Sequence, residues 1–110
     1  MDSCTCLRVS VREDGKDDTG NYKMVFKLQH NGHQSYGQSF TAEFAEGFSV
    51  VELPGDIRAS VSGKELHIER DNQLNDNGLT EIWIKLAAAE QPKVKALRDF
   101  ACKETKDGEN

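Results

Sequence analysis

At 110 residues and a net charge of −5, the chain has the size of one domain and lacks the dense Lys/Arg surface that nucleic-acid binding requires. No window approaches 18 consecutive apolar residues, and the first residues do not have the pattern of a signal peptide. We therefore expect a cytoplasmic protein with no transmembrane segment and no nucleic-acid partner. Residues 31–82 carry three basic and nine acidic side chains, so the acidic excess lies in the middle of the chain.

The first two predicted strands are amphipathic. Residues 7–12 alternate apolar and polar side chains, and residues 22–28 place four large apolar groups on one face. The opposite faces of these strands carry four basic side chains, which are Arg8, Arg12, Lys23 and Lys27. If the strands are neighbours, these side chains form a basic stripe that could dock an acidic partner or an anionic headgroup. The alternative is a solvated face on which they pair with acids across the strands.

A tight turn at Asn31-Gly32 carries the strongest hairpin signal in the chain. A two-residue loop would place Phe26 opposite a glycine. A three-residue loop with a bulge instead sets Phe26 opposite Tyr36 and Tyr22 opposite Phe40. Because it forms two aromatic pairs on one buried face, the bulged register is the one we predict.

The middle of the chain predicts a bulge and a second hairpin. The alternation of apolar side chains breaks at Val50-Val51, which is typical of a bulge or of a bend between layers. A two-residue loop at Ser62-Gly63 would pair Ile57 with Ile68. A last strand, residues 80–86, follows an Asn- and Asp-rich loop.

The pattern changes at the C-terminal end. Pro92 suits the first position of a helix, and Val94, Leu97 and Ala101 form one apolar stripe at helical spacing. We therefore predict a helix at about residues 92–103, followed by a flexible tail at 105–110. The expected fold is mainly β, an antiparallel seven-stranded meander folded as a two-layer sandwich or a partly open barrel. The C-terminal helix packs on it, and residues 1–104 form a single domain.

No motif predicts catalysis or a cofactor. A His30-x2-His33 pair and Cys4-x-Cys6 could supply zinc ligands, but their spacing is not a recognised zinc pattern, so we predict no metal and no cofactor. Cys102 is expected to be a small core residue. No nucleophile, base and acid stand in a recognisable arrangement, and the chain is predicted not to be an enzyme.

The best prediction of function is a non-catalytic module that binds a protein through a sheet face or an edge strand, with a homodimer as one form of it. Trp83, the only tryptophan, lies on the opposite side of its strand from Ile82 and Ile84. It is either covered by the C-terminal helix, which we favour, or exposed as an anchor of an interface.

Two other functions stay open. One is a small-ligand or lipid-headgroup binder with a pocket between the layers or under the helix, lined by Phe26, Tyr36 and Phe40. The other is a small metal-dependent or histidine-based enzyme that uses His30, His33 or His67.

Overall fold

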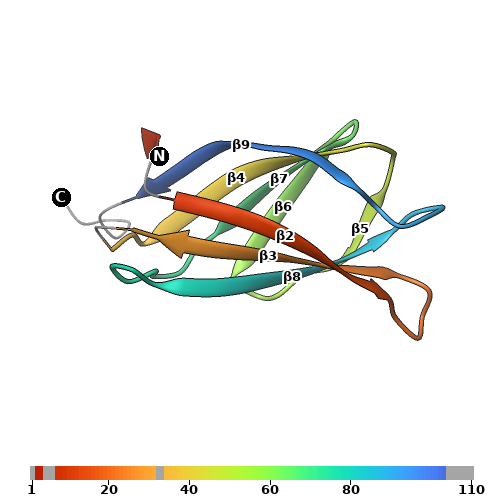
Figure 1. Cartoon of the computed structure of the whole chain (residues 1–110), viewed down its shortest axis with the longest axis horizontal. Helices are drawn as coiled ribbons and strands as arrows, with labels where there is room; N and C mark the ends of the chain where they lie inside the picture. Colours follow the sequence, from red (N-terminus) through yellow and green to blue (C-terminus); the bar gives the residue numbers. More distant parts are fainter. Residues whose placement is uncertain (1, 4–6, 32–33, 104–110) are drawn as a thin grey trace.

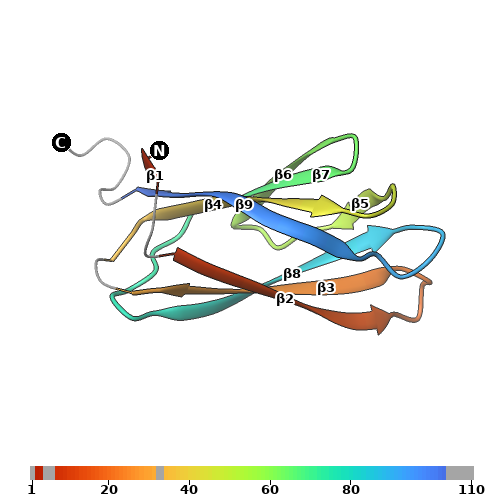
Figure 2. The same ribbon diagram turned by 45° about the horizontal axis from the view of Figure 1, so that its top comes forward.

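The structure, a computed structural model, describes residues 2–3, 7–31 and 34–103, and these form two antiparallel β-sheets packed face to face (Figures 1 and 2). The strands are β1 (Asp2–Ser3), β2 (Leu7–Lys16), β3 (Tyr22–His30), β4 (Gly37–Phe44), β5 (Ser49–Glu52), β6 (Ile57–Ser62), β7 (Glu65–Arg70), β8 (Leu79–Ala87) and β9 (Val94–Lys103). One sheet has the order β1-β9-β4-β7-β6 and the other β2-β3-β8-β5. Of the two predicted architectures, the two-layer sandwich is the one that forms.

The core lies between the two sheets and is filled by alternate residues of the long strands. On β3, the predicted apolar face from Tyr22 to Leu28 is buried, which confirms the amphipathic pattern of that strand. Phe26 on β3 and Phe40 on β4 are fully buried and meet across the layers with their ring centroids 5.4 Å apart. These rings occupy the place of the predicted ligand pocket, so they belong to the core. Cys102 is also buried there, as predicted.

The predicted C-terminal helix is wrong, because β9 pairs with β4 in the five-stranded sheet. The register of β9 shifts twice, once between Glu43 and Phe44 and once between Ser39 and Thr41. At each shift β9 has an extra residue, and Asp99 in the second one has a φ of 59°. Three inward side chains thereby stand three residues apart, namely Val94, Leu97 and Phe100. Two bulges on a strand therefore reproduce the spacing of a helix face.

The predicted meander is also wrong, because the chain repeatedly crosses from one sheet to the other. Within the described residues, consecutive strands pair as hairpins only at β2–β3 and β6–β7. Residues 31–36 link β3 to a strand of the opposite sheet, so Phe26 does not pair with Tyr36. Gly32 and His33 lie outside the described residues, and so does the predicted tail at 105–110. The predicted count of seven strands is too low, because the described residues form nine, of which β1 and β9 were not predicted.

The second predicted hairpin exists with a different register. Ile57 pairs with Arg70, and Ala59 pairs with Ile68, because the two loop residues are Gly63 and Lys64. The shift is by two residues, so the inward side chains stay inward. The predicted irregularity after Val50 is confirmed, since the β5–β8 register shifts between Val50 and Glu52.

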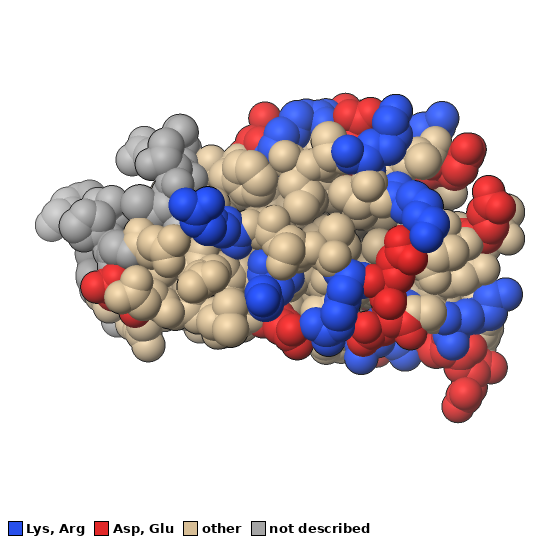
Figure 3. Space-filling model, in the orientation of Figure 1, with Lys and Arg blue, Asp and Glu red and all other residues tan. Residues whose placement is uncertain are grey.

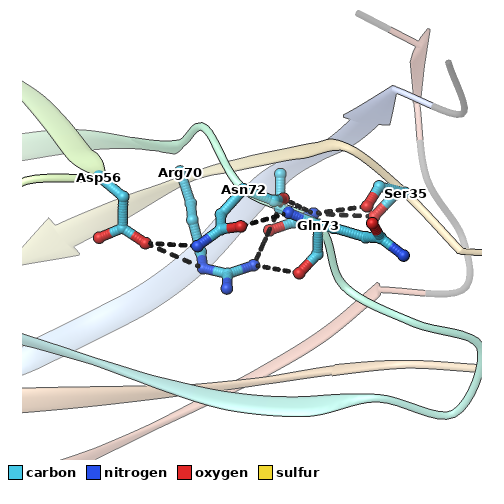
Figure 4. Close-up of polar contacts among 6 residues, drawn as sticks. Ser35, Asp56, Arg70, Asn72 and Gln73 are labelled. Carbon is cyan, nitrogen blue, oxygen red and sulfur yellow. Dashed lines mark hydrogen bonds and ion pairs between the residues drawn. The ribbon is translucent and has the colours of Figure 1, made fainter. Parts of the chain in front are cut away.

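A buried arginine closes one end of the sandwich (Figure 4). Arg70, 8% exposed, donates from Nη1 to Gln38 Oε1 at 2.7 Å and to the carbonyl of Gln73 at 3.3 Å. Its Nε lies 3.7 Å from Asp56 Oδ2, and burial lowers the pKa of the guanidinium. Gln38 Nε2 in turn donates to Ser35 Oγ at 2.9 Å. Because buried polar groups are costly when unpaired, this network holds the β7–β8 loop in place.

The loop between β2 and β3 is held by one carboxylate. Asp17 Oδ1 accepts hydrogen bonds from Thr19 Oγ1 at 2.7 Å, from the Thr19 N–H at 2.9 Å and from the Asn21 N–H at 3.0 Å. Its Oδ2 lies 3.1 Å from Lys85 Nζ on β8. The hydrogen bond from Thr19, with those from Asn21 and Lys85, lowers the pKa of Asp17 far below its usual range.

Replacing the buried arginine tests the end network. Arg70→Met keeps the apolar stem but leaves Gln38 Oε1 and the Gln73 carbonyl without their donor, so we expect a loss of about 1–3 kcal/mol in the free energy of unfolding. Urea denaturation measures it. Arg58→Met is the control, because Arg58 pairs in the open with Glu69 and Asp71 and should matter less. Equal losses in the two variants would contradict a special role for Arg70.

Removing the charge of Asp17 tests the loop. The pKa of Asp17 is lower in the folded chain than in the unfolded chain, where it is about 3.9. The ionised carboxylate therefore stabilises the fold at pH values above about 3.9, and this stabilisation is lost as the pH falls toward and through the folded-state pKa. Asp17→Asn should therefore melt at a lower temperature than the wild type at pH 7, and the gap should narrow below about pH 4. Circular dichroism melts from pH 7 to pH 2 measure both. A gap that is constant over this range would show that the charge of Asp17 is not involved.

Candidate functional site

The outer side of the four-stranded sheet brings together the side chains that the sequence singled out. Strand pairing aligns them in three rows across β2, β3 and β8, which are Arg8–Gln29–Leu79, Ser10–Lys27–Glu81 and Arg12–Val25–Trp83. Their sequence neighbours on the same strands turn into the core, so these side chains point outward. We call these nine residues the Trp83 face.

Trp83 is partly exposed on this face beside Val25, which is only 3% exposed. The prediction that a C-terminal helix covers Trp83 is wrong, because β9 takes the place of that helix and lies in the other sheet. Leu79, two rows away on the same strand, is 58% exposed. The face therefore presents an aromatic ring and a large aliphatic side chain to solvent on one edge of a polar surface.

An ion pair crosses the middle of the Trp83 face. Arg12 Nη1 on β2 lies 2.6 Å from Glu81 Oε2 on β8, so the arginine reaches across β3. Arg12 Nε also donates to Asp14 Oδ1 at 3.0 Å, and Lys23 Nζ lies 3.9 Å from Asp14 Oδ2. The hydrogen bond from Arg12 lowers the pKa of Glu81 and raises that of Arg12. Arg12 and Lys23 therefore follow the predicted alternative of pairing with acids.

Two shallow hollows lie side by side along β2 and β3. The first, about 230 Å³, is lined by Ser10, Val11, Arg12, Val25, Lys27 and Glu81. The second, about 240 Å³, is lined by Arg8, Val9, Ser10, Lys27 and Gln29. Because Ser10 and Lys27 line both hollows, the two adjoin along the strands, and together we call them the track. Figure 3 shows separate Lys and Arg side chains over this lower half of the molecule, with acidic side chains among them toward the right.

Four of the five predicted binding residues therefore belong to the Trp83 face, and Lys23 lies one row beyond it on the same side of the sheet, but their role in binding stays a prediction. Sequence reasoning placed Arg8, Arg12, Lys23 and Lys27 on the outer side of two strands, which the pairing of β2 with β3 confirms. It missed Gln29 and Glu81 as their neighbours. Gln29 is in phase with Lys27 and could have been found, but the pairing of β3 with β8 has no local signal.

The histidine-based or metal-dependent chemistry that the sequence left open as an alternative finds no support in the geometry. His30 is buried at the end of β3, and its backbone N–H donates to the Gly78 carbonyl at 3.0 Å. His33 lies outside the described residues. Among the residues that the structure describes, no cluster of three or more His, Cys, Asp or Glu side chains could hold a metal ion.

His67 lies on the opposite side of the sandwich from the Trp83 face. Its Nδ1 lies 3.0 Å from Thr41 Oγ1, and its Nε2 lies 3.4 Å from Glu69 Oε1. Thr41 is 5% exposed, so its hydroxyl is shielded from a substrate. The hydroxyl of Ser60, the exposed cross-strand partner of His67 on β6, lies in the same hollow, but among the described residues no hydrogen bond joins it to the imidazole as nucleophilic catalysis would require.

A larger hollow of about 440 Å³ lies at one end of the sandwich and is lined by Ala45, Glu46, Glu90, Gln91 and Lys93. It lies between the β4–β5 and β8–β9 connections and has no aromatic side chain in its lining.

In the described part of the chain, no helix is long and apolar enough to cross a membrane.

Comparison with known proteins shows the fold. No family model and no curated protein sequence matches this chain. The solution structure of the chitin-binding domain of Chi18aC from Streptomyces coelicolor matches with a TM-score of 0.64 at 13% identity, over 97% of this chain and 100% of that one. The crystal structure of ChBD2 from Thermococcus kodakarensis KOD1 matches with a TM-score of 0.53 at 13% identity, over 94% and 93% of the two chains. The chain thus has the same fold as these two domains.

Proposed function

We propose that this protein is a non-catalytic carbohydrate-binding module that holds a polysaccharide against the Trp83 face. The observation that carries the proposal is the partly exposed Trp83 beside a polar track on one sheet face. The shared fold with a chitin-binding domain supports a carbohydrate as the ligand, in place of the protein partner expected from the sequence. Fold alone carries little function, so the proposal depends on the chemistry of the face.

The aromatic and aliphatic groups suit the apolar side of a sugar ring. A pyranose presents C–H groups on its ring faces, and a tryptophan offers a large, rigid, apolar surface against which such a face can pack. Val25 supports Trp83 from the neighbouring strand, and Leu79 offers a second, separate apolar group on β8, beyond Glu81. Packing on a fixed ring costs little conformational entropy, because Trp83 is already partly buried.

The polar groups suit sugar hydroxyls. Ser10 can donate and accept, Gln29 offers an amide with both functions, Lys27 donates and Glu81 accepts. Ser10, Lys27 and Gln29 lie close together in the track beside Trp83, because Ser10 pairs with Lys27 across the strands and Gln29 is two residues further along β3. A ligand packed on the ring can therefore bond through its hydroxyls at the same time.

The shape of the site favours an extended chain over a single sugar. The track is open and runs along two strands, whereas a monosaccharide is normally enclosed in a pocket. The larger hollow at the end of the sandwich lacks an aromatic platform. No reacting group is required for this function, and His67 lies on the other side of the molecule.

Removing the ring of Trp83 tests the proposal. In a depletion assay with insoluble chitin and cellulose, Trp83→Ala should bind at least about tenfold more weakly than the wild type, as expected for a central aromatic anchor. Trp83→Phe keeps a ring and should retain part of the affinity. Val61→Ala removes an exposed apolar group from β6 in the other sheet and should bind like the wild type.

The single tryptophan gives a second readout, because a soluble oligosaccharide packed on Trp83 should change the fluorescence of the protein. The proposal fails if no polysaccharide binds or if Trp83→Ala binds as well as the wild type. A stable dimer in light scattering that Trp83→Ala disrupts would favour self-association through this face instead.

A further inference from the structure

We propose that the polysaccharide bound by the Trp83 face is acidic, and that one of its oxyanions, a carboxylate or a sulfate, lies between Arg8 and Lys27. This inference rests on the proposed function and adds the class of ligand.

The hollow at this end of the track has the composition of an anion site. Its side chains supply a guanidinium from Arg8, an ammonium from Lys27, a hydroxyl from Ser10 and an amide from Gln29, with Val9 as the apolar member. No carboxylate is among these lining residues. Each of the four polar groups can donate a hydrogen bond to an oxyanion, and bonds from the two cations are the stronger, charge-assisted kind.

The other cations of this sheet face are already paired. Arg12 binds Asp14 and Glu81, Lys23 lies near Asp14, and Lys85 lies near Asp17 and Glu52. Arg8 and Lys27 are exposed, and neither has an ion pair with any carboxylate of the described residues. Glu81, which stands opposite Ser10 and Lys27 in the same row, is held by Arg12 at 2.6 Å. The two cations therefore remain available to a ligand.

The two cations are also well spaced for one oxyanion. Arg8 is paired with Gln29, which is two residues from Lys27 on the same side of β3, so Arg8 and Lys27 are diagonal neighbours. Such neighbours have Cα atoms about 7–8 Å apart, within reach of two long side chains that converge on one group. Trp83 lies two rows from Arg8, with the row of Lys27 between them. A polysaccharide packed on the ring can therefore continue along the track to the two cations.

The charge of the rest of the molecule sharpens the preference. The chain carries a net charge of −5, so a polyanion is repelled by the molecule as a whole and can be attracted only where cations gather, as Arg8 and Lys27 do. An acidic chain would therefore be oriented with its charged groups toward Arg8 and Lys27.

A panel of soluble polysaccharides tests the inference. Binding of polygalacturonate, which carries carboxylates, of dextran sulfate and of the neutral chain dextran is measured by titration with the full-length protein at 0.05 M and 0.5 M NaCl, alongside insoluble chitin. We expect the acidic chains to bind more tightly than the neutral ones, and the difference to shrink at high salt, because screening weakens exposed charge pairs. The comparison of the affinity for dextran sulfate with that for polygalacturonate decides between a sulfate and a carboxylate as the preferred oxyanion.

Variants locate the effect. Arg8→Gln with Lys27→Gln keeps hydrogen-bonding groups but removes both charges. It should weaken the binding of acidic chains at least about threefold more than it weakens the binding of neutral chains. The matched control is Lys64→Gln combined with Lys16→Gln, which removes the same charge from the β6–β7 turn and from the far end of β2. Equal weakening by the control pair would overturn the inference, because net charge alone would explain it.

The outcomes separate the two proposals. If chitin or another neutral chain binds as tightly as the acidic ones and the Arg8/Lys27 variant has no effect, the acidic ligand is wrong and the carbohydrate-binding function stands. If no polysaccharide of either kind binds, the proposed function fails and this inference fails with it.

Discussion

Phe26 and Phe40 meet across the middle of the sandwich with ring centroids 5.4 Å apart, and this contact decides which side of β3 and β4 faces inward. Because strand side chains alternate, turning Phe26 inward turns Val25 and Lys27 outward. The same alternation places Arg8, Ser10 and Arg12 on the outer side of β2. The candidate site is thus the reverse side of the core, and a change that shifted the register of β3 by one residue would abolish both.

The buried arginine has a different part in the same arrangement. Arg70 and Gln38 fix the loop after β7 through its backbone carbonyls, and that loop leads into β8. The path of this loop therefore sets where β8 begins and how it aligns with β3. Leu79 and Trp83 both lie on β8, so their positions depend on this loop. At the other end of the sheet, Asp17 ties the β2–β3 loop to Lys85, two residues from Trp83. A polar contact therefore anchors the sheet that carries the Trp83 face near each of its ends.

A core filled in this way leaves binding to the outer surfaces. The aromatic rings that a ligand pocket would need are packed against each other, so the remaining options are a sheet face, an edge or the loops at an end. The Trp83 face combines an apolar ring, hydroxyl and amide groups and two cations that no carboxylate of the described residues pairs, within three rows of residues. This combination is suited to reading a long chain of repeating polar units, because each row can contact a different part of the ligand.

The positions of β2 to β8 could be predicted from the sequence alone, and so could the inward faces of strands with clear local alternation, such as residues 7–12 and 22–28. The outward position of Arg8, Arg12, Lys23 and Lys27 followed from the same alternation. The tertiary structure alone decided that 94–103 is a strand, because two bulges gave it the spacing of a helix face. It also decided that β8 lies beside β3, which brings Trp83 next to the basic side chains. Such pairings join residues fifty or more positions apart and depend on how two whole sheets bury their apolar faces, so no local pattern carries them.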